Sequence, residues 1–594
     1  MILRACRELD ISLSVLRTLL DAYFTHMTTF SLFHQPSFGA KIQNVKSLSI
    51  LKAGFAAMLA YAARFETPPP ERVEDGSMGG VLVGTPDHSQ FHRHSLKFLD
   101  DAIAECADEP PSLCLVQVLI VITFNQLIQG VRGRAWRSLG LCVRMAYELG
   151  LHEVDSGEPY RQAPQGTHRL TRWCFDEERR RAWWAIWEMD AFASTIRRCP
   201  LAIDWTEVET YLPVLDNFWF ERQYHRSCFL KAKPIDRVRA LRESKNESPA
   251  AWLVVVISLM REAHLLSKPK GLRNEPYNDI EGKPSQFAAH SNQNKSADVS
   301  ERLAIISHAL HCYSLSLPKG LRYRHEHLSF EPAHRTRAHS SIFNINCTAH
   351  LVTLMLYHNH LGPKLKQQFG QGHTTDDTSN ADTQGLRECI EASDGIFTII
   401  KNSAPEHVRH VNPFLSSTVW FAAAVQLAYR FIAPSGTNTE LVESKVELLR
   451  MNCQQYADFW STPDALLENL SILESHLESQ LGQDQLASGN PARHFRGEDG
   501  AGQQSGGWGH QVDASLLSPD PTIPSGFHHD TTAANTTNPS ESENCYYYGG
   551  QAGTVDAALG DLSMENIGME LDFALDTGEA SLCLDDLLFD SHAA

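Results

Sequence analysis

The sequence predicts an all-α fold, in which one large single helical domain is followed by a disordered acidic C-terminal tail. Apolar residues recur three and four positions apart through most of residues 10–480, which is the spacing of amphipathic helices. No segment among the first 200 residues reads as a convincing strand. Residues 497–594 contain 17 Asp and Glu residues and no Lys or Arg, a composition typical of extended, solvated chain.

The first 200 residues contain a series of predicted amphipathic helices. Each has an apolar stripe and ends at a polar or proline-containing segment, as at Pro68. Gly130 and Gly133 predict a turn between two helices, and Gly150 is suited to the left-handed residue that ends a helix. The predicted helices cover residues 11–27, 48–65, 92–106, 111–126 and 134–150, with another from residue 176 onward.

The helix predicted from Asp176 onward is rich in tryptophan. Asp176 can cap its N-terminus, where Glu177 and Glu178 favour the positive end of the helix dipole. Tryptophans at helical spacing are typical of a buried stripe, although stacking on a ligand is the alternative. The tryptophans that we expect to be mostly buried are Trp136, Trp183, Trp184 and Trp187.

Composition divides the rest of the chain. We predict a helical domain over residues 10–482, with loop insertions near 268–299 and 371–383. Residues 483–555 form a low-complexity linker, and residues 556–594 form a segment in which acidic and apolar side chains alternate. The further helices are predicted at residues 300–315, 341–357, 386–401, 413–431, 441–459 and 464–481.

Charge restricts the classes of partner. The formal net charge is −19, and residues 497–594 carry −17 of it, which leaves 52 basic and 54 acidic side chains in the rest of the chain. An acidic tail on a nearly neutral domain repels nucleic acid and membrane surfaces and suits contact with proteins. The most apolar runs, 113–124 and 252–260, are shorter than the roughly 18–20 residues that span a bilayer, so we expect core helices and no membrane partner.

The cysteines indicate a reducing compartment. All thirteen occur singly, with no Cys-x-x-Cys pair, which is typical of buried thiols. Residues 1–10 contain charged side chains and no apolar core like that of a signal peptide.

Seven segments carry a family resemblance that spans roughly residues 10–480. In this order they resemble the fungal-specific transcription factor domain, the all-helical middle homology region of regulators that read DNA through a separate binuclear zinc-cysteine cluster. One departure is Arg198-Cys199-Pro200, where the family commonly has Gly-Arg-Pro, so we expect that turn to be built differently. The segments are YFTHMTTFSLFHQPSF (23–38), GRAWRSLGLCVRMAYELGLH (133–152), DEERRRAWWAIWEMDAFAST (176–195), RRCPLAID (197–204), LMLYHNHLGPKL (354–365), RECIEASDGIFTII (387–400) and NPFLSSTVWFAAAVQLAY (412–429).

The zinc cluster that the resemblance implies needs six closely spaced cysteines. In this sequence Cys6 stands alone among the first 105 residues, so we expect no zinc, no other cofactor and no DNA-binding residue in this chain. The expectation is that the chain either begins after the zinc-cluster module or belongs to a relative without one. The basic triplet Arg179-Arg180-Arg181 is interpreted as salt-bridging structure, with a DNA contact as the minor alternative.

The acidic tail has the composition of an activation segment. In such segments charge repulsion keeps apolar side chains exposed, and a coactivator groove binds them as an amphipathic helix. The contacts predicted to matter most are Phe573, Leu587, Leu588 and Phe589. The alternative is a tail that only adds solubility.

No enzyme is predicted, because no catalytic or metal-binding pattern occurs; His325-x-His327 and His358-x-His360 lack a third ligand. The expected function is regulation of RNA polymerase II transcription in the nucleus of a fungus. By resemblance, the expected partners are coactivators, a second copy of the chain and a small-molecule effector whose binding residues the sequence does not identify; DNA is a partner only through the zinc-cluster module. The alternative is a co-regulator or scaffold that acts through protein contacts alone.

Overall fold

The computed structural model describes most of the helical domain. Residues 483–487 belong to its last helix, and the remainder of the predicted linker and the whole acidic segment lie outside the described residues. The described ranges are 1–66, 87–157, 162–204, 208–267, 288–331, 333–368, 380–462 and 464–487.

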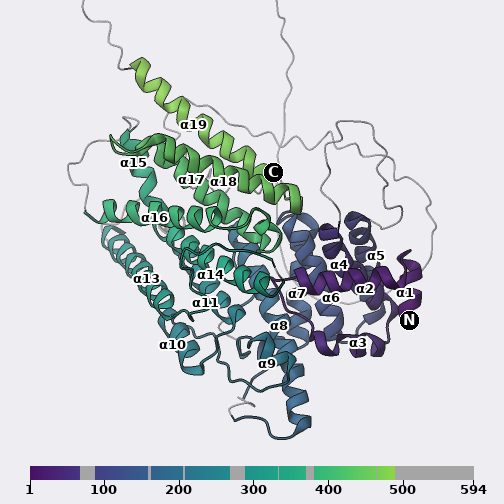
Figure 1. Cartoon of the computed structure of the whole chain (residues 1–594). Coiled ribbons are helices and arrows are strands. Elements are labelled where there is room, and N and C mark those ends of the chain that lie inside the picture. Colours follow the sequence, from purple (N-terminus) through teal and green to yellow (C-terminus); the bar gives the residue numbers. More distant parts are fainter. Residues whose placement is uncertain are drawn as a thin grey trace, which may run out of the picture. The chain divides into compact units, whose positions relative to one another are not determined.

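The all-α prediction is confirmed for these ranges (Figure 1). Within them the only β feature is an isolated bridge between Leu328 and Ser403. The helices are α1 (Ile2–Glu8), α2 (Leu13–His26), α3 (Gln35–Asn44), α4 (Leu48–Glu66), α5 (His88–Cys106), α6 (Leu113–Ile128), α7 (Gly133–Glu148), α8 (Thr167–Ile196), α9 (Asp216–Phe220), α10 (Pro234–Ser244), α11 (Pro249–Leu266), α13 (Ala288–Ser316), α14 (Ala333–Tyr357), α15 (Leu361–Gln368), α16 (Asn380–Lys401), α17 (Ser416–Ile432), α18 (Thr439–Trp460) and α19 (Ala465–Ala487).

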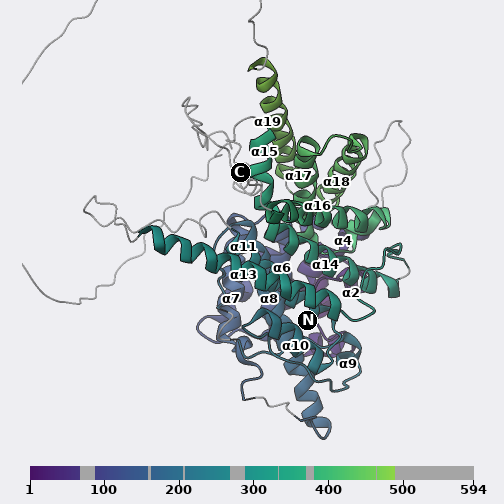
Figure 2. The ribbon, with the colours of Figure 1, turned by 90° about the vertical axis from the view of Figure 1, so that its left-hand side faces the viewer.

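One hydrophobic core joins most of these helices, and a second, smaller cluster packs α9 against the N-terminal part of α8. In the first half of the chain α4 packs against α2, α5 and α6, and in the second half α14 packs against α11 and α16. The long helix α8 contacts α6, α7 and α11 and so connects the two halves. α11 contacts both α8 and α14, and Figure 2 shows these helices close together; residues of all three line the cavity described below.

The turns around α7 follow the sequence prediction. Gly130 and Gly133 both have positive φ in the turn between α6 and α7. Gly150 has a φ of 59° after the last turn of α7, as expected of a left-handed residue that ends a helix.

The predicted start of the tryptophan helix is wrong, whereas the predicted burial of the tryptophans is confirmed. Asp176 does not cap a helix, because α8 already begins at Thr167; Asp176 lies in its interior, paired with Arg172 and Arg179. Trp183, Trp184 and Trp187 are buried on α8, and Trp136 of α7 is mostly buried at the edge of the core, with the Arg197 guanidinium 5.3 Å from its ring centroid.

Both predicted loop insertions are shorter than expected. The helix α13 begins at Ala288, inside 268–299, and α16 begins at Asn380, inside 371–383. Their first turns are polar, so the apolar period that marks the rest of each helix is missing there.

The turn after α8 departs from the family in residue type. Arg198 has a φ of 52°, which is the left-handed conformation that favours glycine. An arginine in this conformation costs about 1–3 kcal/mol, which the surrounding contacts offset. Among these contacts, Asp190 accepts hydrogen bonds from the backbone of Ala202 and Ile203 at 2.9 and 3.0 Å.

Two helices have the length and composition of membrane spans. They are α4, over Leu48–Phe65, and α11, over Pro249–Leu266. In the structure, 83% and 78% of these windows is buried, which fits the predicted role of core helices. The apolar segment of α11 is longer than the sequence predicts, because the run 252–260 leaves out the helical turns on either side of it.

The cysteines of the described residues are all free thiols. Burial raises the pKa of Cys142, Cys389 and Cys453 to about 12 in each case. Burial also raises the pKa of Cys347. These thiols are therefore protonated at neutral pH and belong to the core.

The contact between α14 and α16 depends on a glycine. A Cβ atom added to Gly395 would lie 2.2 Å from Cε1 of His350, so Gly395→Ala must displace that ring. We expect this variant to lose about 1–3 kcal/mol of unfolding free energy, measured by urea denaturation. Gly140 is the control, since its added Cβ meets nothing within 4 Å on an exposed face of α7. Equal unfolding midpoints for Gly395→Ala and Gly140→Ala would contradict the close approach.

Candidate functional site

A cavity of about 440 Å³ lies among α8, α11, α14 and the segment after α2. Its volume is within the range of about 300–1,000 Å³ typical of small-molecule sites. Most of its lining is apolar, and the larger apolar contributors are Phe30, Trp184, Leu253, Val254, Leu321 and Ile345.

The cavity extends from the surface into the core. Asn217, Glu247 and Gly320 line it and are exposed, so they mark its mouth. Trp184 and Glu188 line it and are only 3% and 5% exposed, so they mark its inner end. The Trp184 indole is fixed in place, because its Nε1 donates a 2.8 Å hydrogen bond to the carbonyl of Tyr211.

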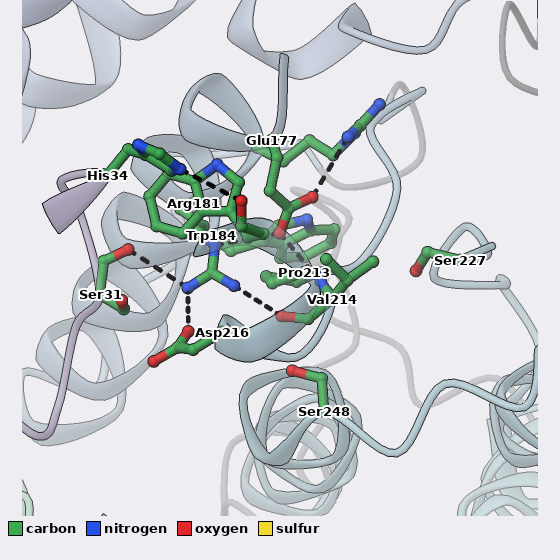
Figure 3. A network of polar contacts seen from close by, with 12 residues as sticks. Ser31, His34, Glu177, Arg181, Trp184, Pro213, Val214, Asp216, Ser227 and Ser248 are labelled. Atoms are coloured by element: carbon green, nitrogen blue, oxygen red, sulfur yellow. Dashed lines mark hydrogen bonds and ion pairs between the residues drawn. The ribbon is translucent and has the colours of Figure 1, made fainter. Parts of the chain in front are cut away.

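The Arg181 guanidinium anchors one wall (Figure 3). It donates to Asp216 Oδ1 at 2.5 Å, to the Val214 carbonyl at 2.6 Å and to Glu177 Oε1 at 3.0 Å. Asp216 also accepts from Arg337 of α14 at 2.7 Å. Burial by itself would raise the pKa of Asp216, but the two guanidinium groups hold it below its usual value. The ion pairs therefore connect α8, α9 and α14 around the cavity.

Every arginine of the basic triplet of α8 forms ion pairs with carboxylates of the protein. Arg180 is 2% exposed and forms a bidentate pair with Asp155, at 2.8 and 2.6 Å. Arg179 pairs with Asp176 and donates to backbone carbonyls of the loop after α7. The interpretation of this triplet as salt-bridging structure is confirmed.

A carboxyl group lies at the inner end of the cavity. Glu188 Oε1 accepts a 2.8 Å hydrogen bond from Asn412 Nδ2, and the backbone N–H of Asn412 donates at 3.0 Å to Asn344 Oδ1. Burial raises the pKa of Glu188 to about 8, against the opposing effect of the Asn412 hydrogen bond. The carboxyl is therefore mostly protonated at neutral pH.

The predicted activation contacts Phe573, Leu587, Leu588 and Phe589 lie outside the described residues. The sequence reasoning did not identify the cavity. One signal was available: Glu188 falls in the apolar run WWAIWEMDAF, where a carboxylate among core positions calls for a partner. Asn344 and Asn412 gave no such signal, since asparagines are common at exposed positions.

Comparison with known proteins points to fungal transcription regulators. Residues 20–313 match the family model described as fungal specific transcription factor domain. The chain is 21% identical over 493 residues to an uncharacterized transcriptional regulatory protein of Schizosaccharomyces pombe, covering 75% of this chain and 46% of that protein. It is 25% identical over 183 residues to a tropolone cluster transcription factor of Talaromyces stipitatus, covering 31% of each.

A third relative is a Zn(2)-C6 fungal-type transcription factor of Fusarium oxysporum f. sp. lycopersici, 27% identical over 191 residues. This match covers 32% of the chain and 19% of the relative. The chain thus spans less than half the length of each of these three relatives. No solved structure matches the chain.

Proposed function

This chain belongs to the fungal specific transcription factor family, and on that basis we propose that it regulates RNA polymerase II transcription in the nucleus, with a helical domain that senses a small effector and an acidic tail that recruits coactivators. A role in transcription regulation follows from the family and the relatives. The observation that supports effector sensing is the cavity, which opens at the surface, reaches into the core and has a mainly apolar lining with polar groups at its inner end.

The cavity is placed where an effector can change the domain. Its walls come from α8, α11 and α14, which are separate in sequence and pack in the middle of the core. A molecule bound there stabilises the arrangement of these helices by its binding free energy. Occupancy can therefore shift the domain toward the helix arrangement that binds the molecule.

DNA binding in this proposal belongs to a zinc-cluster module of the kind named for the Fusarium relative, and not to this chain. We expect the chain alone to bind duplex DNA no better than a neutral protein, because the basic triplet of α8 is already paired with carboxylates. Fluorescence anisotropy with labelled duplexes measures this. Sequence-specific, salt-sensitive binding at nanomolar concentration would refute it.

The second candidate is a co-regulator that works through protein contacts without a zinc cluster. The genomic sequence upstream of the Met1 codon separates the two: six closely spaced in-frame cysteine codons support the zinc-cluster regulator, and a stop codon without them supports the co-regulator.

The activation role of the tail is tested with a reporter. We expect residues 556–594, fused to an unrelated DNA-binding domain, to activate transcription, since apolar side chains supply the surface that a coactivator buries, at about 1.5–3 kcal/mol for each fully enclosed residue. Alanine at Phe573, Leu587, Leu588 and Phe589 together should abolish the signal. The control Asp586→Asn should keep it, because the charge is shared among many carboxylates. Equal reporter output from the parent and the quadruple variant would contradict the activation role and support a tail that only adds solubility.

A further inference from the structure

Two polar atoms at the inner end of the cavity have no hydrogen-bond partner among the described residues. Glu188 uses Oε1 to accept from Asn412, and Oε2 bonds to no residue of the described ranges. Asn344 uses Oδ1 to accept from the Asn412 backbone, and its Nδ2 likewise bonds to none of them. The two side chains are only 5% and 4% exposed. Both residues line the cavity, and neither atom is among the fully enclosed unpartnered atoms of the described residues, so both can be reached from the cavity and can bond to a polar group of a bound molecule.

Asn412 holds this pair in position. It is 1% exposed, and its side-chain oxygen accepts from the backbone N–H of Phe414 at 3.1 Å. Its side-chain and backbone nitrogens then bind Glu188 and Asn344, so one residue orients both cavity groups before any ligand arrives. Preorganised polar groups of this kind lower the entropy lost on binding.

The charges around the cavity leave its interior neutral. Arg181 and Arg337 both pair with Asp216, and Arg181 also pairs with Glu177. Glu247 is exposed at the mouth, so its charge is solvated. In the segment before Asn412, burial lowers the pKa of His407 and lowers that of His410 to about 4. Among the described residues that line the inner end, none therefore carries an unpaired charge for an ionic ligand.

We propose that the cavity binds a neutral, mainly apolar small molecule through one carbonyl group, which accepts hydrogen bonds from Asn344 Nδ2 and from the protonated Glu188 carboxyl. The apolar body of the ligand packs against Trp184, Leu253 and Ile345. This inference rests on the proposed effector-sensing role and gives that effector a chemical class. An anionic ligand group would meet no unpaired cationic side chain among the described residues at the inner end of the cavity. A cationic ligand group would be favoured only if Glu188 were ionised.

Three probes with the same phenyl body test the chemical class: 4-phenylbutan-2-one, 3-phenylpropanoate and 3-phenylpropylamine. They are titrated into the full chain by ligand-observed NMR at about pH 6, where Glu188 is protonated. We expect the ketone to bind roughly tenfold more tightly than the acid or the amine. Failure of the ketone to bind saturably, or tighter binding of either charged probe, would overturn the proposal.

Substitutions at Glu188 and Asn344 test whether these two side chains donate hydrogen bonds to the ketone. Glu188→Gln keeps a neutral donor and should retain ketone binding, whereas Glu188→Leu and Asn344→Leu should each weaken it roughly tenfold. In the parent, ketone affinity should fall as the pH rises through about 8, because ionised Glu188 no longer donates, and Glu188→Gln should remove this dependence. A pH dependence that persists in Glu188→Gln would contradict the assigned proton. Circular dichroism checks the fold of each variant, and the conservative Gln variant keeps the test valid if a leucine variant unfolds.

The reporter assay of the tail is independent of these titrations. If the probes fail while the tail still activates, the carbonyl site is wrong and the regulatory function stands. If the tail fails while the ketone binds with the expected variant pattern, the site stands and the activation role is wrong.

Discussion

Replacement of Trp184 by alanine should lower the free energy of unfolding by about 3–5 kcal/mol, the range for removing a large aromatic side chain from a core. The indole is 3% exposed, donates to the Tyr211 carbonyl and packs edge-on against Trp187 with ring centroids 5.6 Å apart. Its loss would also enlarge the existing cavity, since Trp184 already forms part of the wall. Urea denaturation followed by far-UV circular dichroism measures the change.

Trp136→Ala is the matched control for this variant. Trp136 is partly buried and is covered by Arg197, so its removal leaves a surface that water can reach. Trp136→Ala should therefore lower the free energy of unfolding clearly less than Trp184→Ala does. If Trp184→Ala unfolded at the same urea concentration as the parent, the assignment of Trp184 to the core would be wrong.

Arg180→Met should also cost about 3–5 kcal/mol, because it removes one partner of a buried ion pair. Asp155 is fully buried and would keep the backbone N–H of Tyr211 at 2.9 Å but lose both hydrogen bonds from the guanidinium. Glu177 would lose a 3.2 Å contact as well. The measurement is again the free energy of unfolding in urea.

A double variant separates the cost of the stranded charge from the cost of lost packing. When Asp155→Leu is added to Arg180→Met, no carboxylate remains uncompensated at that position, so part of the loss should be recovered. Arg179→Met serves as a comparison on the same helix, since its side chain is more accessible. Additive losses in the double variant would show that Asp155 and Arg180 do not stabilise one another.

Local patterns predicted the helices well and their ends less well. The spacing of apolar residues predicted the ends of α4, α6 and α18 to within two residues; α18 has an apolar stripe facing the core, whereas α6 is buried on every side from Leu115 to Ile128. The start of α8 was placed at Asp176 and not at Thr167, because an acidic residue before two glutamates resembles an N-terminal turn. In the folded chain Asp176 and Glu177 pair with arginines of the same helix, and Glu178 pairs with Lys41 of α3.

The cavity depends on contacts that no local pattern contains. Glu188 and Asn412 are 224 residues apart, and Arg337 and Asp216 are 121 residues apart. Periodicity shows which side of α8 faces inward, but it does not show which helix covers that side. The family resemblance predicted that an effector binds, but it did not identify the binding residues. The cavity becomes visible only in the three-dimensional packing of α8, α11 and α14.

The buried thiols of the core can also report when individual helices open. Cys142, Cys347, Cys389 and Cys453 lie on α7, α14, α16 and α18, and each is protonated and shielded in the folded domain. An alkylating reagent reacts with a thiolate that has reached solvent, so each cysteine becomes labelled only when its own helix opens. The order in which mass spectrometry detects the four labels would therefore rank the local stability of four helices without any substitution. A ligand that occupies the cavity should slow labelling of Cys347 most, since α14 supplies part of the cavity wall.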